Sequence, residues 1–197
     1  MSRASRREKH VRRRSVMAEE SQYGTRTPGD VRGPLLRLIL NFVRAVREIR
    51  GVERLAVLGS LLTDKPRPKD ADVLVSITED IDFSAVARLG RRFKGQAQGI
   101  NSGADVFLAD HTRRYIGRVC QYRECRPRTL CRARHCGACP HLNDDLDVVS
   151  LSPALIAAPP LVVHPAILLN VSAPLDVTAI LLAPLWTDGR SGAGPCR

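Results

Sequence analysis

Aromatic side chains are scarce in this sequence of 197 residues, because Phe, Tyr and Trp together make up only 4% of it. A chain of this length can bury a sizeable core, and that core must be mainly aliphatic. Long uninterrupted apolar runs are also missing. Residues 148–175 contain no Asp, Glu, Lys or Arg, but five prolines interrupt them, which is too broken a pattern for a membrane-spanning helix.

Acidic residues are the minority, since 31 Lys and Arg stand against 20 Asp and Glu, for a net charge of +11. The excess lies in two arginine-rich segments. Residues 1–14 hold seven basic residues against one acidic residue, and residues 111–140 hold eight arginines against Glu124. Such segments attract nucleic acid or another acidic partner. They are equally compatible with a solvated tail and a solvated surface.

The N-terminus is arginine-rich and has no apolar leader, so we expect a cytoplasmic protein without a membrane span, where disulfides are uncommon. Cys136 and Cys139 have the spacing of a zinc knuckle, and Cys120 and Cys125 could complete a tetrahedral Zn²⁺ site. Unliganded or redox-active thiols are the alternative that this spacing leaves open. The cysteine-rich block contains Cys120, Cys125, Cys131, Cys136 and Cys139.

Composition divides the chain into four parts. Residues 1–33 form a basic segment without a lasting apolar period, which we expect to be disordered. Residues 34–110 carry the patterns of a folded core, and residues 111–150 form an Arg- and Cys-rich extension of it. Residues 151–197 are a Pro-rich apolar tail, which could pack across the core, dock a partner or stay irregular.

The core is predicted to contain helix, strand, strand, helix and strand in that order. Apolar residues recur at helical spacing from residue 35 to residue 49, and Gly51 follows as a cap. Strands are predicted at 52–58, 70–77 and 104–109, with helices at 82–95 and 111–122. This order indicates an α/β (α+β) domain with a small mixed sheet flanked by helices, a disordered N-terminus and an irregular C-terminal tail.

Two aspartates open the second predicted strand, where they are poor choices for stability. Asp70 and Asp72 are two residues apart, so their carboxylates point to the same side of the sheet. Asp105 opens the next strand in the same way. Three clustered carboxylates remain ionised together only around a cation, and hard oxygen ligands favour Mg²⁺ or Mn²⁺. The sequence therefore predicts a divalent-metal site.

A Gly-Ser pair precedes these aspartates and ends the first strand. Gly59 would let the backbone approach a ligand closely, and the Ser60 hydroxyl with nearby backbone N–H groups could hold phosphate oxygens. Lys65 and Lys69 lie in the following loop and could neutralise the charge of a triphosphate. Phosphoryl-type transfer needs a phosphate cradle and a metal site side by side.

The stretch Leu58-Gly59-Ser60, nine intervening residues and Asp70-Ala71-Asp72-Val73 resembles the signature of the DNA polymerase β-type nucleotidyltransferase superfamily. The resemblance covers roughly residues 35–110 and is closest to minimal members of that superfamily. It implies a small mixed sheet, a metal site made by the two motif carboxylates and a third, by position Asp105, and phosphate contacts from Gly59 and Ser60.

The resulting hypothesis is a metal-dependent nucleotidyltransferase that moves a nucleoside monophosphate from an NTP, with ATP as the first candidate, to an acceptor. The acceptor could be a protein, an RNA or a small molecule. Asp105 could also act as a base toward that acceptor. Two alternatives remain, namely a catalytically inactive nucleotidyltransferase fold that serves as a toxin–antitoxin-like binding module, and an Arg/Cys-rich nucleic-acid-binding protein.

Overall fold

The computed structural model of the protein describes residues 30–120, 142–143, 151–167 and 172–191. The described residues from Val31 onward belong to one compact unit with mixed α/β structure. Its main elements follow in chain order: α2 (Arg32–Val46), β1 (Val52–Leu58), the 3₁₀ turn η1 (Gly59–Leu62), β2 (Asp70–Ile77), α3 (Phe83–Gln98), β3 (Gly103–Ala109), β4 (Tyr115–Val119), β5 (Leu142–Asn143), β6 (Leu161–His164), α4 (Leu175–Val177), the π-helical turn η2 (Thr178–Leu182) and α5 (Ala183–Ser191).

The strands form one mixed sheet in the order β5-β4-β3-β2-β1-β6. Strands β2 and β3 are parallel, and the other neighbouring pairs are antiparallel. Strand β2 therefore lies in the interior of the sheet, between β1 and β3. The prediction of a small mixed sheet is confirmed.

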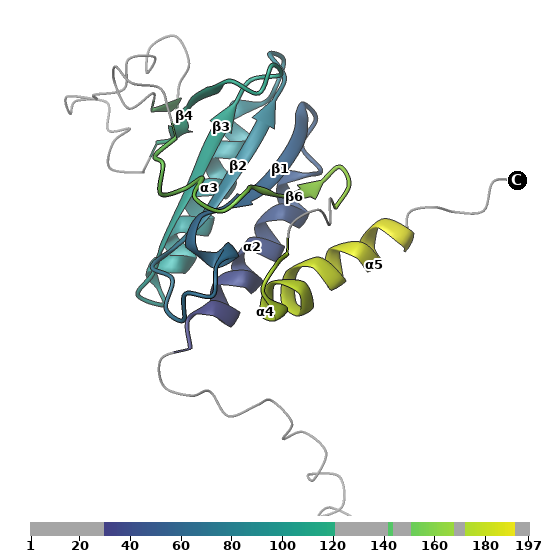
Figure 1. Ribbon diagram of the computed structural model, residues 1–197. Helices are drawn as coiled ribbons and strands as arrows, with labels where there is room; N and C mark the ends of the chain where they lie inside the picture. Colours follow the sequence, from purple (N-terminus) through teal and green to yellow (C-terminus); the bar gives the residue numbers. More distant parts are fainter. Residues whose placement is uncertain (1–29, 121–141, 144–150, 168–171, 192–197) are drawn as a thin grey trace, which may run out of the picture. The chain divides into compact units, whose positions relative to one another are not determined.

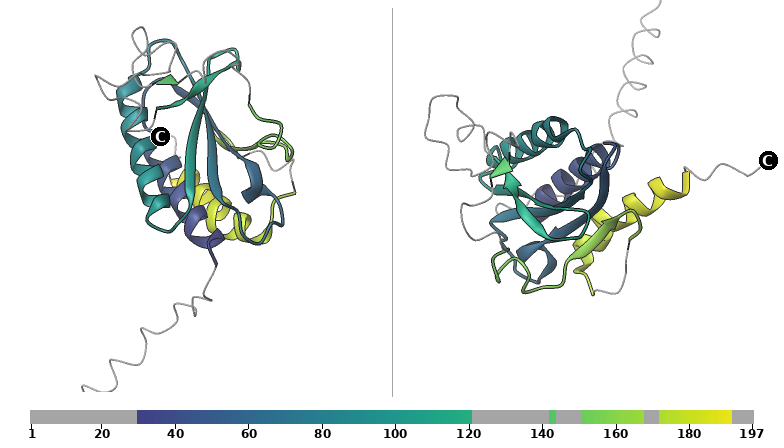
Figure 2. Two further views of the ribbon diagram at one scale, coloured as in Figure 1. Left: turned by 90° about the vertical axis from the view of Figure 1, so that its left-hand side faces the viewer. Right: turned by 90° about the horizontal axis from the view of Figure 1, so that it is seen from above.

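Helices α2 and α3 cover one face of this sheet (Figures 1 and 2). Alternation in the strands explains the packing, because every second residue of a strand points to the same face. In β2 the helix-facing side chains are aliphatic, as predicted, and all are buried. Phe42 and Phe93 stack between the two helices with their ring centroids 4.9 Å apart. The helix-facing residues of the two parallel strands are Ala71, Val73, Val75, Ile77, Ala104, Val106 and Leu108.

The segment after residue 110 differs from its sequence-based prediction. Residues 111–122 were predicted to form a helix, but residues 115–119 form strand β4. A tight turn closes the hairpin with β3, because the Asp110 amide donates to the Arg114 carbonyl at 2.9 Å and Arg113 takes a positive φ of 69°. Pairing with the edge of β3 outweighs the weak helical pattern. Helix α3 was predicted to end at Gly95, but it continues for about one more turn to Gln98.

The C-terminal part of the chain is more regular than its prolines suggested. Strand β6 pairs with β1 and completes the sheet on that side. The helical segment from α4 to α5 packs its apolar residues into the same core as α2. The expectation of an irregular tail is therefore wrong for these residues. The side chains that this segment buries are Val177, Leu181, Leu182 and Leu185. None of the helices in the described ranges is long and apolar enough to cross a membrane.

Arg32 connects the C-terminal helices to the turn that follows β1. Its Nε and one terminal nitrogen donate to the Asp176 carboxylate at 2.6 and 3.1 Å. Its terminal nitrogens also donate to the carbonyls of Leu61, Thr63 and Lys65 at 2.9, 3.0 and 2.8 Å. These five hydrogen bonds use every donor of the guanidinium. Arg32 therefore fixes the backbone of residues 61–65, although the sequence had placed it in a disordered segment.

Because of the Arg32–Asp176 pair, we expect the stability of the fold to depend on pH. The hydrogen bond from Arg32 lowers the pKa of Asp176 from its ordinary 3.8. A carboxylate with a lowered pKa stabilises the fold above its ordinary value, and this contribution is lost as the pH falls through the lowered one. We expect Asp176→Asn to cost about 1–2 kcal/mol at neutral pH. In urea titrations the difference from wild type should shrink below about pH 4. A difference that stays constant with pH would refute this role of the pair.

Candidate nucleotide and metal site

Gly59 lies at the sharp turn from β1 into η1. Its φ is +75°, a backbone conformation that residues with a Cβ adopt only under strain. A Cβ built at this position would lie 2.6 Å from Oδ2 of Asp72. Glycine is therefore required here twice, once for the turn and once for the close approach of the Asp72 carboxylate. This contact brings the Gly-Ser pair and the aspartates together, as the sequence predicted.

Asp72 lies in the interior strand, opposite Leu58 of β1 and Asp105 of β3. The residue is only 7% exposed. Burial, together with repulsion from the nearby Asp70 and Asp105, raises its pKa from 3.8 to about 7, although Lys94 acts in the opposite direction. Within the described residues, its carboxylate makes no hydrogen bond or ion pair. Buried polar groups nearly always have a partner, so Asp72 is suited to hold a proton or a cation.

Asp70 precedes Asp72 on the same face of β2 and is exposed. Its register partner on β3 is Gly103. A Cβ built at Gly103 would overlap the Asp70 carboxylate, so this carboxylate lies directly over the glycine backbone. No sequence pattern indicated Gly103, because its importance depends on which residue the parallel register places opposite it. Asp70 and Asp72 are thus both accommodated by a glycine of a neighbouring segment.

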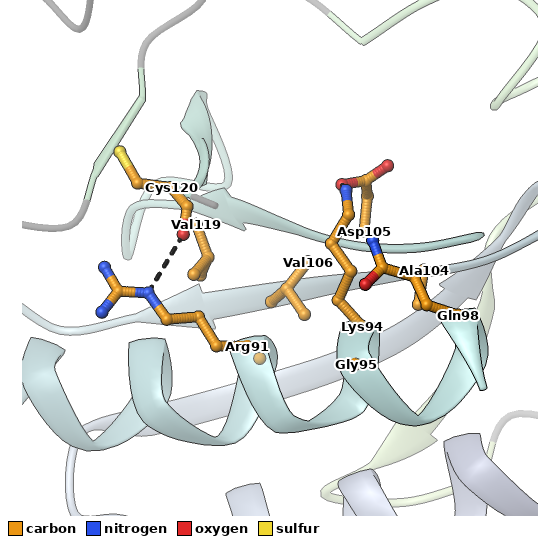
Figure 3. A pocket seen from close by; sticks show the side chains of 10 residues that line it. Arg91, Lys94, Gly95, Gln98, Ala104, Asp105, Val106, Val119 and Cys120 are labelled. Atoms are coloured by element: carbon orange, nitrogen blue, oxygen red, sulfur yellow. Dashed lines mark hydrogen bonds and ion pairs between the residues drawn. The ribbon is translucent and has the colours of Figure 1, made fainter. Parts of the chain in front are cut away.

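Asp105 is the register neighbour of Asp72 on β3, as the sequence predicted, but it already has a cationic partner. Nζ of Lys94 lies 2.8 Å from its Oδ1. In the described part of the chain, β4 pairs with β3 only from Phe107 onward, so Lys94 can reach past the edge of β3 from helix α3 (Figure 3). Among the described residues, no group of three or more His, Cys, Asp or Glu is placed to hold one metal ion.

A cavity of about 440 Å³ lies beside this ion pair, between α3 and the edge of β3. Arg91 spans its far end and donates from Nε to the Cys120 carbonyl at 3.3 Å (Figure 3). Two of the residues of α3 that line the cavity, Gly90 and Gly95, have no side chain to fill it. The aliphatic part of the Lys94 side chain therefore runs along the cavity to Asp105 and not through a packed core.

The loop between η1 and β2 carries the remaining residues of the predicted phosphate site. Ser60 is half-buried, and its carbonyl accepts hydrogen bonds from the amide and hydroxyl of Thr63 at 3.2 and 2.8 Å. Lys65 and Lys69 are exposed. Because Arg32 holds three carbonyls of residues 61–65, the loop backbone is fixed while these lysine side chains extend into solvent.

Residues 151–160 cross the face of the sheet opposite the helices (Figures 1 and 2). The Gly59 amide donates to the Leu155 carbonyl at 3.1 Å. A side-chain methyl of Leu155 would lie 3.6 Å from a Cβ built at Gly59. This segment, the strap, therefore covers the turn that the sequence pattern predicted to bind phosphate. Sequence patterns could not reveal the contact, because Gly59 and Leu155 belong to widely separated segments.

Most of the cysteine-rich block lies outside the described residues, including Cys125, Cys136 and Cys139. Cys120 is fully buried at the end of β4. It also lines the wall of the cavity. The predicted zinc site stays a prediction.

Comparison with known proteins gives no family assignment. No family model, no curated protein and no solved structure matches this chain. The functional argument therefore rests on the geometry of the site.

Proposed function

We propose that this protein is a divalent-metal-dependent nucleotidyltransferase whose site is formed by Gly59, Ser60 and the aspartates of β2 and β3. The observation that carries the proposal is Asp72, a buried carboxylate without a partner in the described structure, against the turn at Gly59. Its pKa is raised to about 7, and a bound cation would relieve both causes of that shift. Carboxylate oxygens are the ligands that Mg²⁺ and Mn²⁺ prefer, so the donor set fits the ion.

In this proposal Asp70 and Asp72 hold the ion, which would neutralise charge on a triphosphate and orient it. Gly59 and Ser60 lie where the phosphates would bind, and Lys65 and Lys69 contribute positive charge from the loop. Asp105 lies beside Asp72 and faces the acceptor side of the same site. A phosphate oxygen would accept the Gly59 N–H that now donates to Leu155, so the strap must shift when a nucleotide binds.

The test is nucleotidyl transfer from α-labelled NTPs, with Mg²⁺ or Mn²⁺, to protein, RNA and small-molecule acceptors. We expect Asp70→Asn and Asp72→Asn each to reduce transfer at least about a hundredfold, because charge stabilisation dominates such reactions. Glu79→Gln is the matched control, since Glu79 is an exposed carboxylate beyond the far end of β2. Wild-type protein that neither binds nor transfers any NTP would refute the proposal.

A second candidate function is a nucleotidyltransferase-like fold that binds a nucleotide or partner without turnover. Two observations favour it, namely the Lys94 ammonium on Asp105 and the Leu155 carbonyl on the Gly59 amide. Calorimetry separates the two candidates. A nucleotide that binds in a metal-dependent manner, with no transfer to any acceptor, would support the binding module.

A further inference from the structure

We infer that the Lys94 ammonium takes the place of a second metal ion in this site. The chain then binds one divalent ion, at Asp70 and Asp72, while Asp105 forms its ion pair with Lys94. This inference rests on the proposed function, because it concerns the metal of the same site. It assigns Asp105 a role different from that of a third metal ligand. It also assigns a role to Lys94, which no sequence motif indicated.

The ion pair has the geometry of a fixed structural contact. Nζ of Lys94 and Oδ1 of Asp105 are 2.8 Å apart, and the two side chains are only 19% and 32% exposed. Partly buried pairs are screened by salt less than surface pairs. The lysine arrives from helix α3 (Figure 3). Asp70 and Asp72 alternate with the helix-facing residues of β2 and so face the opposite side of the sheet, where the lysine stem does not obstruct access to their carboxylates.

Charge balance favours a single divalent ion. The site contains three carboxylates and one ammonium, so one divalent ion brings its formal charge to zero. Lys94 contacts one oxygen of Asp105, Oδ1, so a metal bound at about 2.1 Å from the other oxygen would lie close to the Lys94 ammonium. Two cations on one carboxylate would repel each other strongly in this partly buried place. The Lys94 ammonium therefore disfavours a metal ion on Asp105.

The unpartnered carboxylate is the one that needs the ion. Asp72 is more than nine-tenths buried and has no hydrogen bond or ion pair within the described residues. Among the described residues, Lys94 forms its ion pair with Asp105 and not with Asp72. The lysine neutralises the charge of Asp105, so the uncompensated negative charge of the site lies on Asp70 and Asp72 of β2. This distribution places the single metal position between Asp70 and Asp72, next to Gly59.

The experiment is a Mn²⁺ titration of the full chain, without nucleotide, followed by electron paramagnetic resonance. Wild type should bind one Mn²⁺ per chain, and Asp72→Asn should bind none at this site. Lys94→Met removes the ammonium and keeps the stem. It should gain a second Mn²⁺ or tighten binding by about tenfold, because the site loses its internal cation. Arg92→Met, an exposed arginine on the same helix, is the matched control and should behave as wild type.

A double variant tests the assignment of Asp105 separately. Lys94→Met with Asp105→Asn removes both partners and leaves the net charge unchanged, so it should still bind one Mn²⁺ with an affinity near that of wild type. The inference is overturned if wild type binds two ions, if Lys94→Met binds as wild type does, or if the double variant loses Mn²⁺. Wild type that binds no Mn²⁺ at all would overturn the metal-dependent function as well, which distinguishes the two failures.

Discussion

Asp72→Asn should make the metal-free protein more stable at pH 8, although it removes the group most directly implicated in function. The pKa of Asp72 is raised from 3.8 to about 7, so the folded state holds this proton more tightly than the unfolded state does. The contribution of Asp72 to wild-type stability therefore falls as the pH rises from about 4 to about 7, and stays low above that. Asparagine is neutral at every pH, and we expect it to gain about 1–3 kcal/mol at pH 8.

The measurement is urea unfolding in the presence of a chelator from pH 4 to pH 8. The gain of Asp72→Asn over wild type should shrink toward pH 4, where the wild-type carboxyl is protonated in both states. Glu79→Gln makes the same chemical change at an exposed site and should show no comparable gain. An Asp72→Asn protein that is less stable than wild type throughout this range would contradict the account of Asp72.

Mn²⁺ should reverse the order of stability, so that wild type becomes more stable than Asp72→Asn. A ligand that binds only the folded state stabilises it by about 4.1 kcal/mol at a thousand times its Kd, which exceeds the gain of about 1–3 kcal/mol expected for Asp72→Asn. Wild type should gain this stability at saturating Mn²⁺, and Asp72→Asn should not. The reversal distinguishes a functional carboxylate from one that is merely badly placed.

Gly59→Ala should destabilise the protein by about 2–4 kcal/mol. Alanine at a φ of +75° is strained, and its Cβ would lie 2.6 Å from Oδ2 of Asp72. The carboxylate is buried and cannot simply rotate into solvent. Metal binding should weaken in the same variant, because the new methyl group displaces one of the two carboxylates that we propose as ligands of the ion. Urea unfolding and Mn²⁺ titration measure the two effects.

Gly95→Ala is the control for this substitution. Gly95 is exposed on α3, and a Cβ built there would meet nothing within 4 Å. Removing a glycine from a helix interior should stabilise the protein by about 0.5–1 kcal/mol. Gly59→Ala with unchanged stability would mean that the turn is less constrained than its backbone conformation indicates.

The parts of the site that the sequence predicted are those that depend on local patterns. Alternation in residues 70–77 placed Asp70 and Asp72 on one face, and the structure keeps them there. The position of Asp105 beside Asp72 followed from a third strand adjacent to the second, which the parallel pairing confirms. Gly59 was recognised because a glycine that ends an apolar strand is a local signal as well.

The parts that the sequence missed come from contacts between distant segments. Lys94 is one polar residue on an amphipathic helix, and only the open edge beside Asp105 gives it a partner. Leu155 and Arg32 lie in segments whose composition suggested irregular structure. Each is fixed by backbone groups of the turn after β1. Nearly every residue has a backbone carbonyl and amide, so the residue types could not have indicated these two contacts.

The central claim is that Asp72 holds a divalent ion beside the turn at Gly59. The most direct measurement is anomalous diffraction at the manganese edge, from crystals soaked with Mn²⁺ and a non-hydrolysable nucleoside triphosphate. We expect one strong peak about 2.1 Å from carboxylate oxygens of Asp70 and Asp72, with the lysine still on Asp105 and the strap shifted from the Gly59 amide. Crystals of soaked protein without a manganese peak at Asp72 would contradict the account.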